Sequence, residues 1–115
     1  MTELLELKSS KPIREWKKRT PFLTRLLMYS GFTEVERALD NYIDNLNSLN
    51  FPASETAIMA IVESTIERLN RINLKHELID TLEREDLCEF ISKAAEVAGM
   101  QIPRGTDITL SFRDW

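Results

Sequence analysis

The sequence predicts an all-α fold, a bundle of four to five helices with a short docked C-terminal tail. Apolar residues between positions 20 and 99 recur at three- and four-residue steps, the spacing of one face of a helix. The chain holds only three glycines and four prolines, which we place at helix boundaries. At 115 residues, with 43% hydrophobic side chains, it is expected to form one domain: a basic arm (residues 1–19), a helical body (20–99) and a tail (100–115).

The first helix of the body is expected over residues 21–30. Thr20 suits the N-cap and Pro21 the first helical position. Gly31 is expected to end this helix as its C′ residue, because glycine takes the left-handed conformation without strain. The large apolar residues of the segment are Phe22, Leu23, Leu26, Leu27 and Tyr29.

Two longer helices follow. Thr33 and Glu36 form a capping-box pattern, so the second helix is predicted to begin at Thr33. Its apolar stripe is Val35, Leu39, Tyr42, Leu46 and Leu49. The third helix is predicted over residues 54–71. It is the most apolar of the elements, and we therefore place it at the centre of the fold.

The last helix is predicted to begin at Asp80-Thr81, where the aspartate can cap it, and to end at Gly99. It follows a short connecting segment, NLKHELI. A further short helix is expected within the basic arm, over residues 13–16. These elements together make up the predicted bundle.

The tail ends with TDITLSFRDW, which fits two structures. Alternating apolar and polar residues would suit a strand, and residues 3–7 (ELLEL) are the one segment that could pair with residues 108–112. Ile108, Phe112 and Trp115 also fit one helical face, so that a docked short helix or irregular tail is the other interpretation. A third alternative is that the tail pairs with another chain.

Charge divides the sequence into two parts. Between Lys8 and Arg25 lie seven basic residues and a single acid, Glu15, whereas residues from Leu26 onward carry twice as many acids as bases. We expect the arm to fold back onto the acidic body, with Trp16 in the core.

The alternative for the arm is a small nucleic-acid-binding regulator. Arg14, Lys17 and Lys18 would bind phosphates while Trp16 stacks on a base. The pI of about 5.1 argues against it, because nucleic-acid-binding domains are usually basic.

The acidic body favours a protein-binding function. Six acidic residues are predicted to contact a partner: Glu36, Asp40, Asp44, Glu83, Asp86 and Glu89. The first three lie on the second helix, away from its apolar stripe. Such a face would attract a basic protein partner and speed its association.

Catalytic and cofactor-binding patterns are scarce. Glycines stand singly, so neither a phosphate-binding loop nor a dinucleotide fingerprint is present, and no cofactor is expected. A metal-dependent enzyme would have to use His76, Asp80 and Cys88, a weak ligand set. We therefore expect neither a catalytic nor a metal site.

Localisation is expected to be cytoplasmic. No apolar run approaches the length of a membrane span, the N-terminal residues lack the layout of a secretory signal, and the single cysteine cannot form an internal disulfide.

The segment ELIDTLEREDLCEFISKAAEVAGM, followed by DITLSFRDW, resembles the C-terminal half of small acidic bacterial proteins that serve as immunity proteins of toxin–immunity systems. The resemblance rests on an I-D turn, an E-R-E helix with a cysteine, and an acidic-aromatic end. It implies a non-enzymatic inhibitor that neutralises a cognate toxin by direct contact.

Overall fold

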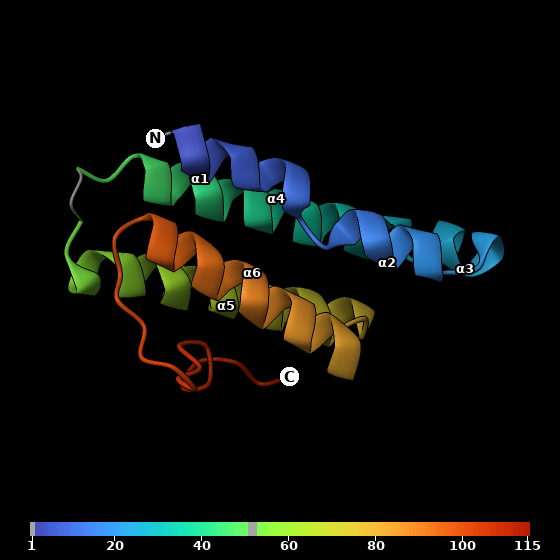
Figure 1. Cartoon of the computed structure of the whole chain (residues 1–115). Helices are drawn as coiled ribbons and strands as arrows, with labels where there is room; N and C mark the ends of the chain where they lie inside the picture. The colour runs from blue at the N-terminus through green and yellow to red at the C-terminus, as the bar shows by residue number, and fades with distance from the viewer. Residues whose placement is uncertain (1, 51–52) are drawn as a thin grey trace.

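The computed structural model describes residues 2–50 and 53–115. Its helices are α1 (Thr2–Glu6), the 3-10 helix η1 (Leu7–Ser10), α2 (Ile13–Arg19), α3 (Phe22–Leu27), α4 (Tyr29–Asn47), α5 (Glu55–His76) and α6 (Thr81–Val97). The described residues contain no strand, and the predicted all-α bundle is confirmed. The molecule is elongated, 45 × 28 × 23 Å, with α3 at one extremity (Figure 1).

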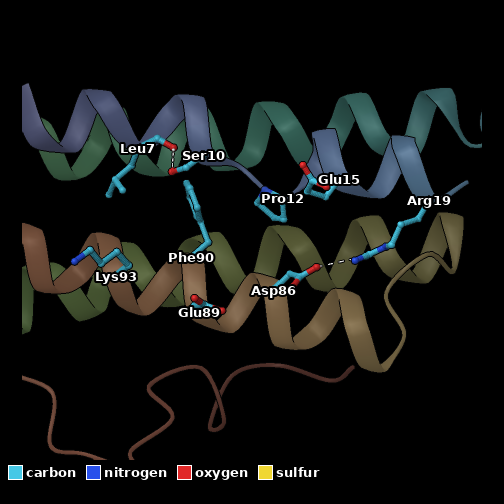
Figure 2. A pocket seen from close by; sticks show the side chains of 9 residues that line it. All are labelled: Leu7, Ser10, Pro12, Glu15, Arg19, Asp86, Glu89, Phe90 and Lys93. Atoms are coloured by element: carbon cyan, nitrogen blue, oxygen red, sulfur yellow. Dashed lines mark hydrogen bonds and ion pairs between the residues drawn. The ribbon is translucent and has the colours of Figure 1, made fainter.

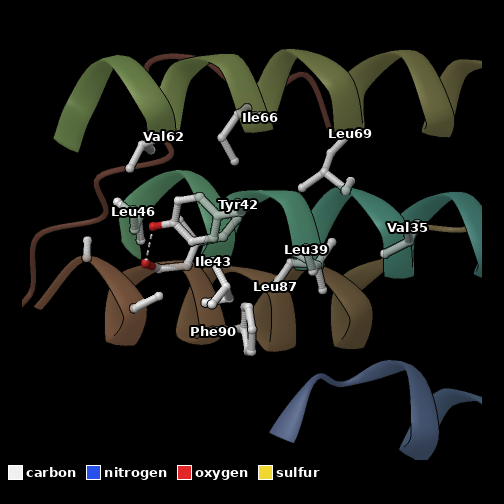
Figure 3. Close-up of a cluster of buried hydrophobic side chains, with 14 of the residues drawn as sticks. Val35, Leu39, Tyr42, Ile43, Leu46, Val62, Ile66, Leu69, Leu87 and Phe90 are labelled. Atoms are coloured by element: carbon white, nitrogen blue, oxygen red, sulfur yellow. Dashed lines mark hydrogen bonds between the residues drawn. The ribbon is translucent and has the colours of Figure 1, made fainter. Parts of the chain in front are cut away.

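The core lies between the three long helices, and Figure 3 shows α4 between α5 and α6. Side chains of α4 meet those of α5 on one side and of α6 on the other. The buried residues labelled there are Val35, Leu39, Tyr42, Ile43 and Leu46 of α4, Val62, Ile66 and Leu69 of α5, and Leu87 and Phe90 of α6. The buried Tyr42 hydroxyl donates a hydrogen bond of 2.7 Å to the carbonyl of Ile91, which ties α4 to α6. Burial raises the pKa of Tyr42 well above its ordinary value.

The basic arm is part of the core, as predicted. Helices α1, η1 and α2 lie along α4 (Figure 1), and Leu4, Ile13 and Trp16 are buried. The Trp16 side chain is 2% exposed, and its indole N–H donates to the Asp86 carboxylate at 2.9 Å. Its ring lies 6.4 Å from that of Phe32, centroid to centroid. The arm therefore bridges α4 and α6.

The predicted boundary at Gly31 is wrong. Helix α3 ends at Leu27 and α4 begins at Tyr29, so α4 continues through both Gly31 and Thr33. The capping box predicted at Thr33 and Glu36 therefore lies inside a helix. Gly31 serves close packing instead, because a Cβ at this position would lie 2.4 Å from Cδ2 of Leu78 and 3.0 Å from Cγ of His76. Glycine lets the segment after α5 cross α4 closely.

Replacing Gly31 by alanine is expected to lower the free energy of unfolding. Helix propensity alone would favour alanine by about 1 kcal/mol, but overpacking a filled site costs about 1–3 kcal/mol. Ser30→Ala is the matched control, because Ser30 is exposed in the same helical turn. Chemical denaturation should show Gly31→Ala less stable than wild type and Ser30→Ala at least as stable. A Gly31→Ala variant more stable than wild type would contradict the packing argument.

Helix α5 extends beyond its predicted end at residue 71, to His76. The apolar stripe continues through the buried Ile72, and Glu77 caps the helix in a left-handed conformation (φ 51°, ψ 47°). Because no glycine follows His76, the usual sequence signal for a helix C-terminus is missing, and the predicted end of this helix was too early. The predicted cap of the last helix is confirmed, since Asp80 and Glu83 form a capping box at the start of α6.

The tail is an irregular docked segment, and the pairing of residues 3–7 with 108–112 does not form. Residues 3–6 belong to α1, where Leu4 packs into the core. The tail consists of turns, with Ile108 and Thr109 buried. The Asn70 side chain of α5 holds it, donating to the carbonyl of Phe112 (2.9 Å) and accepting from the N–H of Asp114 (3.2 Å). The tail therefore packs within its own chain.

A polar network stiffens the tail. Asp107 accepts hydrogen bonds from Thr109 and forms an ion pair of 3.0 Å with Arg113. Partial burial acts to raise the pKa of Asp107, but the bonds from Thr109 and Arg113 outweigh it, and the pKa is lowered overall. The Arg113 guanidinium also lies 5.8 Å from the ring centre of Trp115.

Candidate functional site

The three acids predicted on α4 are paired with the basic arm. Lys8 lies 2.7 Å from Asp44, and Lys11 lies 2.6 Å from Asp40. The longer contacts of this group are Lys11–Glu36 at 3.7 Å and Lys17–Glu36 at 3.8 Å. The hydrogen bond to Asp44 raises the pKa of Lys8. Because the arm supplies a cation to each of these acids, they do not form an open acidic face.

The predicted acids on α6 have a similar arrangement on the other flank of the arm. Arg19 lies 3.5 Å from Glu83 and 3.4 Å from Asp86, the same carboxylate that accepts from Trp16. A recess of about 370 Å³ lies between the arm and α6. Figure 2 shows the side chains that line it, among them Asp86, Glu89 and Phe90. Glu89 is exposed there. The six predicted residues thus fall into two groups, separated by the arm.

The three residues of the metal-enzyme alternative have different partners. His76 bonds to Glu34 of α4, Asp80 caps α6, and the Cys88 thiol lies 3.2 Å from the hydroxyl of Thr109. Among the residues that the structure describes, no three His, Cys, Asp or Glu side chains come together as a candidate metal site.

The Glu34–His76 contact links α4 to the last turn of α5. Glu34 also lies 3.8 Å from Lys75. The hydrogen bond from His76 lowers the pKa of Glu34, and the charges of Lys75, His76 and Arg68 add to this effect. The bond lies next to the point where Gly31 of α4 and Leu78 approach closely. It therefore helps to hold the C-terminal end of α5 against α4.

The lowered pKa of Glu34 predicts a pH-dependent contribution to stability. A carboxylate whose pKa is lower in the folded state stabilises the fold above the unfolded pKa, and the contribution is lost as pH falls through the folded pKa. Glu34→Gln is therefore expected to be less stable than wild type at neutral pH. The difference should shrink once pH falls below about 4, the ordinary range of glutamate. Denaturation of both proteins across pH 3 to 7 is the measurement; a constant difference would contradict the assignment.

Five of the nine large hydrophobic side chains that are exposed among the described residues lie at one end of the bundle, on α3 and the start of α4. We call it the apolar tip: Phe22 (62% exposed), Leu23 (73%), Leu26 (58%), Leu27 (86%) and Tyr29 (65%). Helix α3 buries none of its residues. Monomeric soluble proteins rarely expose large contiguous apolar patches, and such patches commonly mark interaction sites.

Beside the apolar tip lies a groove lined by cations, of about 440 Å³. We call it the basic groove: Lys8, Ser9, Lys11, Ile13, Arg14, Lys17, Lys18, Arg25 and Glu36. Arg25 joins the two surfaces, because its guanidinium donates to the carbonyl of Lys17 at 3.3 Å and lies 5.6 Å from the ring centre of Phe22. Groove and tip therefore form one continuous surface.

Sequence reasoning missed the apolar tip, and it considered three cations of the basic groove, Arg14, Lys17 and Lys18, only as part of the nucleic-acid alternative. Phe22, Leu23, Leu26 and Leu27 occupy two neighbouring rows of a six-residue helix, so the apolar pattern was evident, but its exposure was not. The Trp16 indole, which the nucleic-acid alternative needs on the surface, is buried and cannot stack on a base without unfolding α2.

Comparison with known proteins gives no family assignment. The chain matches no protein-family model, no curated protein and no solved structure. The resemblance to immunity proteins therefore stays a prediction. Within the described ranges, no helix combines the length and the apolar character needed to cross a bilayer.

Proposed function

We propose that this protein is a non-enzymatic protein-binding module that docks its partner through the apolar tip. The observation that carries the proposal is the exposure of five large apolar side chains on consecutive turns at one end of the bundle. An amphipathic helix normally packs its apolar face against the core, but none of the residues of α3 is buried. A partner that covers it would gain about 25 cal/mol for each Å² of apolar surface removed from water.

The arrangement of the fold supports this choice of surface. The tip is held by rigid neighbours, because α2 inserts Ile13 and Trp16 into the core on one side and α4 runs directly into it on the other. Apolar anchors on a rigid support lose little conformational entropy on binding. Five of the six predicted acidic residues, by contrast, already have a basic residue of the arm as a charged partner.

An immunity-type inhibitor is one form of such a module. It would block a toxin by direct contact, as the resemblance of residues 77–115 implies. The apolar tip supplies the affinity. The predicted acidic residues contribute only to the long-range electrostatic attraction of the partner; they are Glu36, Asp40, Asp44, Glu83, Asp86 and Glu89.

Photo-crosslinking in the cells that produce the protein tests the proposal. A photoreactive amino acid at position 27, in the tip, should give a discrete covalent adduct with another protein. The matched control is position 110, because Leu110 is 62% exposed but lies on the tail. Mass spectrometry would identify the adduct and show whether it is the product of an adjacent gene. No adduct at position 27, or the same adducts at both positions, would overturn the proposal.

A further inference from the structure

We infer that the segment which occupies the apolar tip is an acidic amphipathic helix of the partner protein, lying across both the tip and the basic groove. The inference rests on the proposed function and specifies the chemistry of the partner. It rests also on a separate observation, the charge of the surface that continues from the tip.

The basic groove keeps cations that the chain itself does not neutralise. Lys8, Lys11 and Lys17 pair with acids of α4. Within the described residues, neither Arg14 nor Arg25 lies within 4.0 Å of a carboxylate. Lys18 has only an exposed contact of 3.6 Å with Glu15, its neighbour on the same helix. Such exposed pairs contribute little, so Lys18 remains available to a partner.

The available cations have a spacing that suits a helix. Arg14 and Lys18 are four residues apart on α2, so they project from one face about 6 Å apart along the axis. Two carboxylates at i and i+4 of a partner helix have the same spacing. Beyond them Arg25 lies at the junction of groove and tip, beside the Phe22 ring. The surface thus presents Arg14 and Lys18 first, then Arg25, then the apolar tip. A partner helix with carboxylates on one turn and apolar residues on the following turns would match this order.

Two other occupants fit the surface less well. A second copy docked tip to tip about a two-fold axis would bring the same surface, an apolar tip beside a groove lined mainly by cations, and this surface does not complement the basic groove in charge. An anionic membrane would attract the cations too, but a flat bilayer reaches into a recess of about 440 Å³ less well than a helix does.

A selection experiment with the full-length chain tests the inference. Random helical peptides are displayed and selected for binding to the immobilised protein, and the affinities of the enriched peptides are measured by fluorescence anisotropy. The expected binders carry acidic residues at i and i+4 next to an apolar stripe. The double variant Arg14→Glu with Lys18→Glu should weaken them by about tenfold or more, since it replaces two attractions by two repulsions. Arg104→Glu, an exposed cation of the tail, is the control and should leave the affinity unchanged.

The outcomes separate the inference from the proposed function. Binders that need the tip but are basic or neutral, or that ignore Arg14→Glu with Lys18→Glu, would overturn the inference and leave the protein-binding proposal standing. Binders that ignore substitutions in the tip, or no binders at all, would count against both. Tip-dependent binding to vesicles containing phosphatidylserine, tighter than to any peptide, would assign the surface to membranes, and a concentration-dependent dimer in sedimentation would assign it to a second copy.

Discussion

Replacing Trp16 by alanine is expected to lower the free energy of unfolding by about 3–5 kcal/mol, the usual cost of truncating a large buried aromatic. The indole is 2% exposed and packs between α4 and α6, so its loss leaves a cavity at the centre of the arm's contact with the body. Native proteins are stable by only about 5–15 kcal/mol, so the variant should lose a large fraction of its free energy of unfolding. Urea denaturation followed by circular dichroism measures the effect.

Two controls separate packing from hydrogen bonding. Trp16→Phe keeps most of the apolar volume and removes the bond to Asp86, and it should cost about 1–2 kcal/mol. Lys18→Ala lies on the same helix but is exposed, and it should change stability by no more than about 0.5 kcal/mol. If Trp16→Ala unfolds no more easily than Lys18→Ala, the arm is not part of the core and the acidic residues beneath it are available to partners.

The position of the arm changes the meaning of the acidic composition. The chain carries a net charge of −4, which by itself favours a basic partner. In the structure the arm acts as that partner within the molecule, with Lys8, Lys11 and Arg19 placed on the acids of α4 and α6. The apolar tip, by contrast, stays exposed, and Lys18 beside it has only a contact of 3.6 Å with Glu15 of its own helix.

Local signals in the sequence predicted much of the fold. The start of α6 was found because Asp80 and Glu83 cap it through bonds to neighbouring residues. The apolar residues that predicted α4 and α5 recur every three or four positions, so this signal too depends only on residues near one another in the sequence. The role of Gly31 was not predictable, since it depends on contacts with His76 and Leu78, which are distant in sequence. The periodicity of apolar residues also cannot show whether another part of the chain covers an apolar face. The exposure of α3 could therefore be recognised only from the structure.

Polar replacement of the tip is expected to weaken partner binding strongly without loss of the fold. We choose Leu23→Gln with Leu27→Gln, because glutamine favours helices and leaves the charge of the basic groove unchanged. Both leucines are largely exposed, so the free energy of unfolding should change by no more than about 1 kcal/mol. Binding should weaken at least about 100-fold, since the two leucines together contribute about 3–6 kcal/mol when fully buried by a partner. Leu110→Gln is the matched control on the tail.

The affinity of the partner captured at position 27 for these variants is the most direct test of the central claim, that the tip serves binding and not folding. Isothermal titration calorimetry should show wild type and Leu110→Gln binding equally, and Leu23→Gln with Leu27→Gln at least about 100-fold more weakly at unchanged thermal stability. Equal affinity of all three proteins would contradict the claim, and so would unfolding of the tip variant, because the leucines would then belong to the fold.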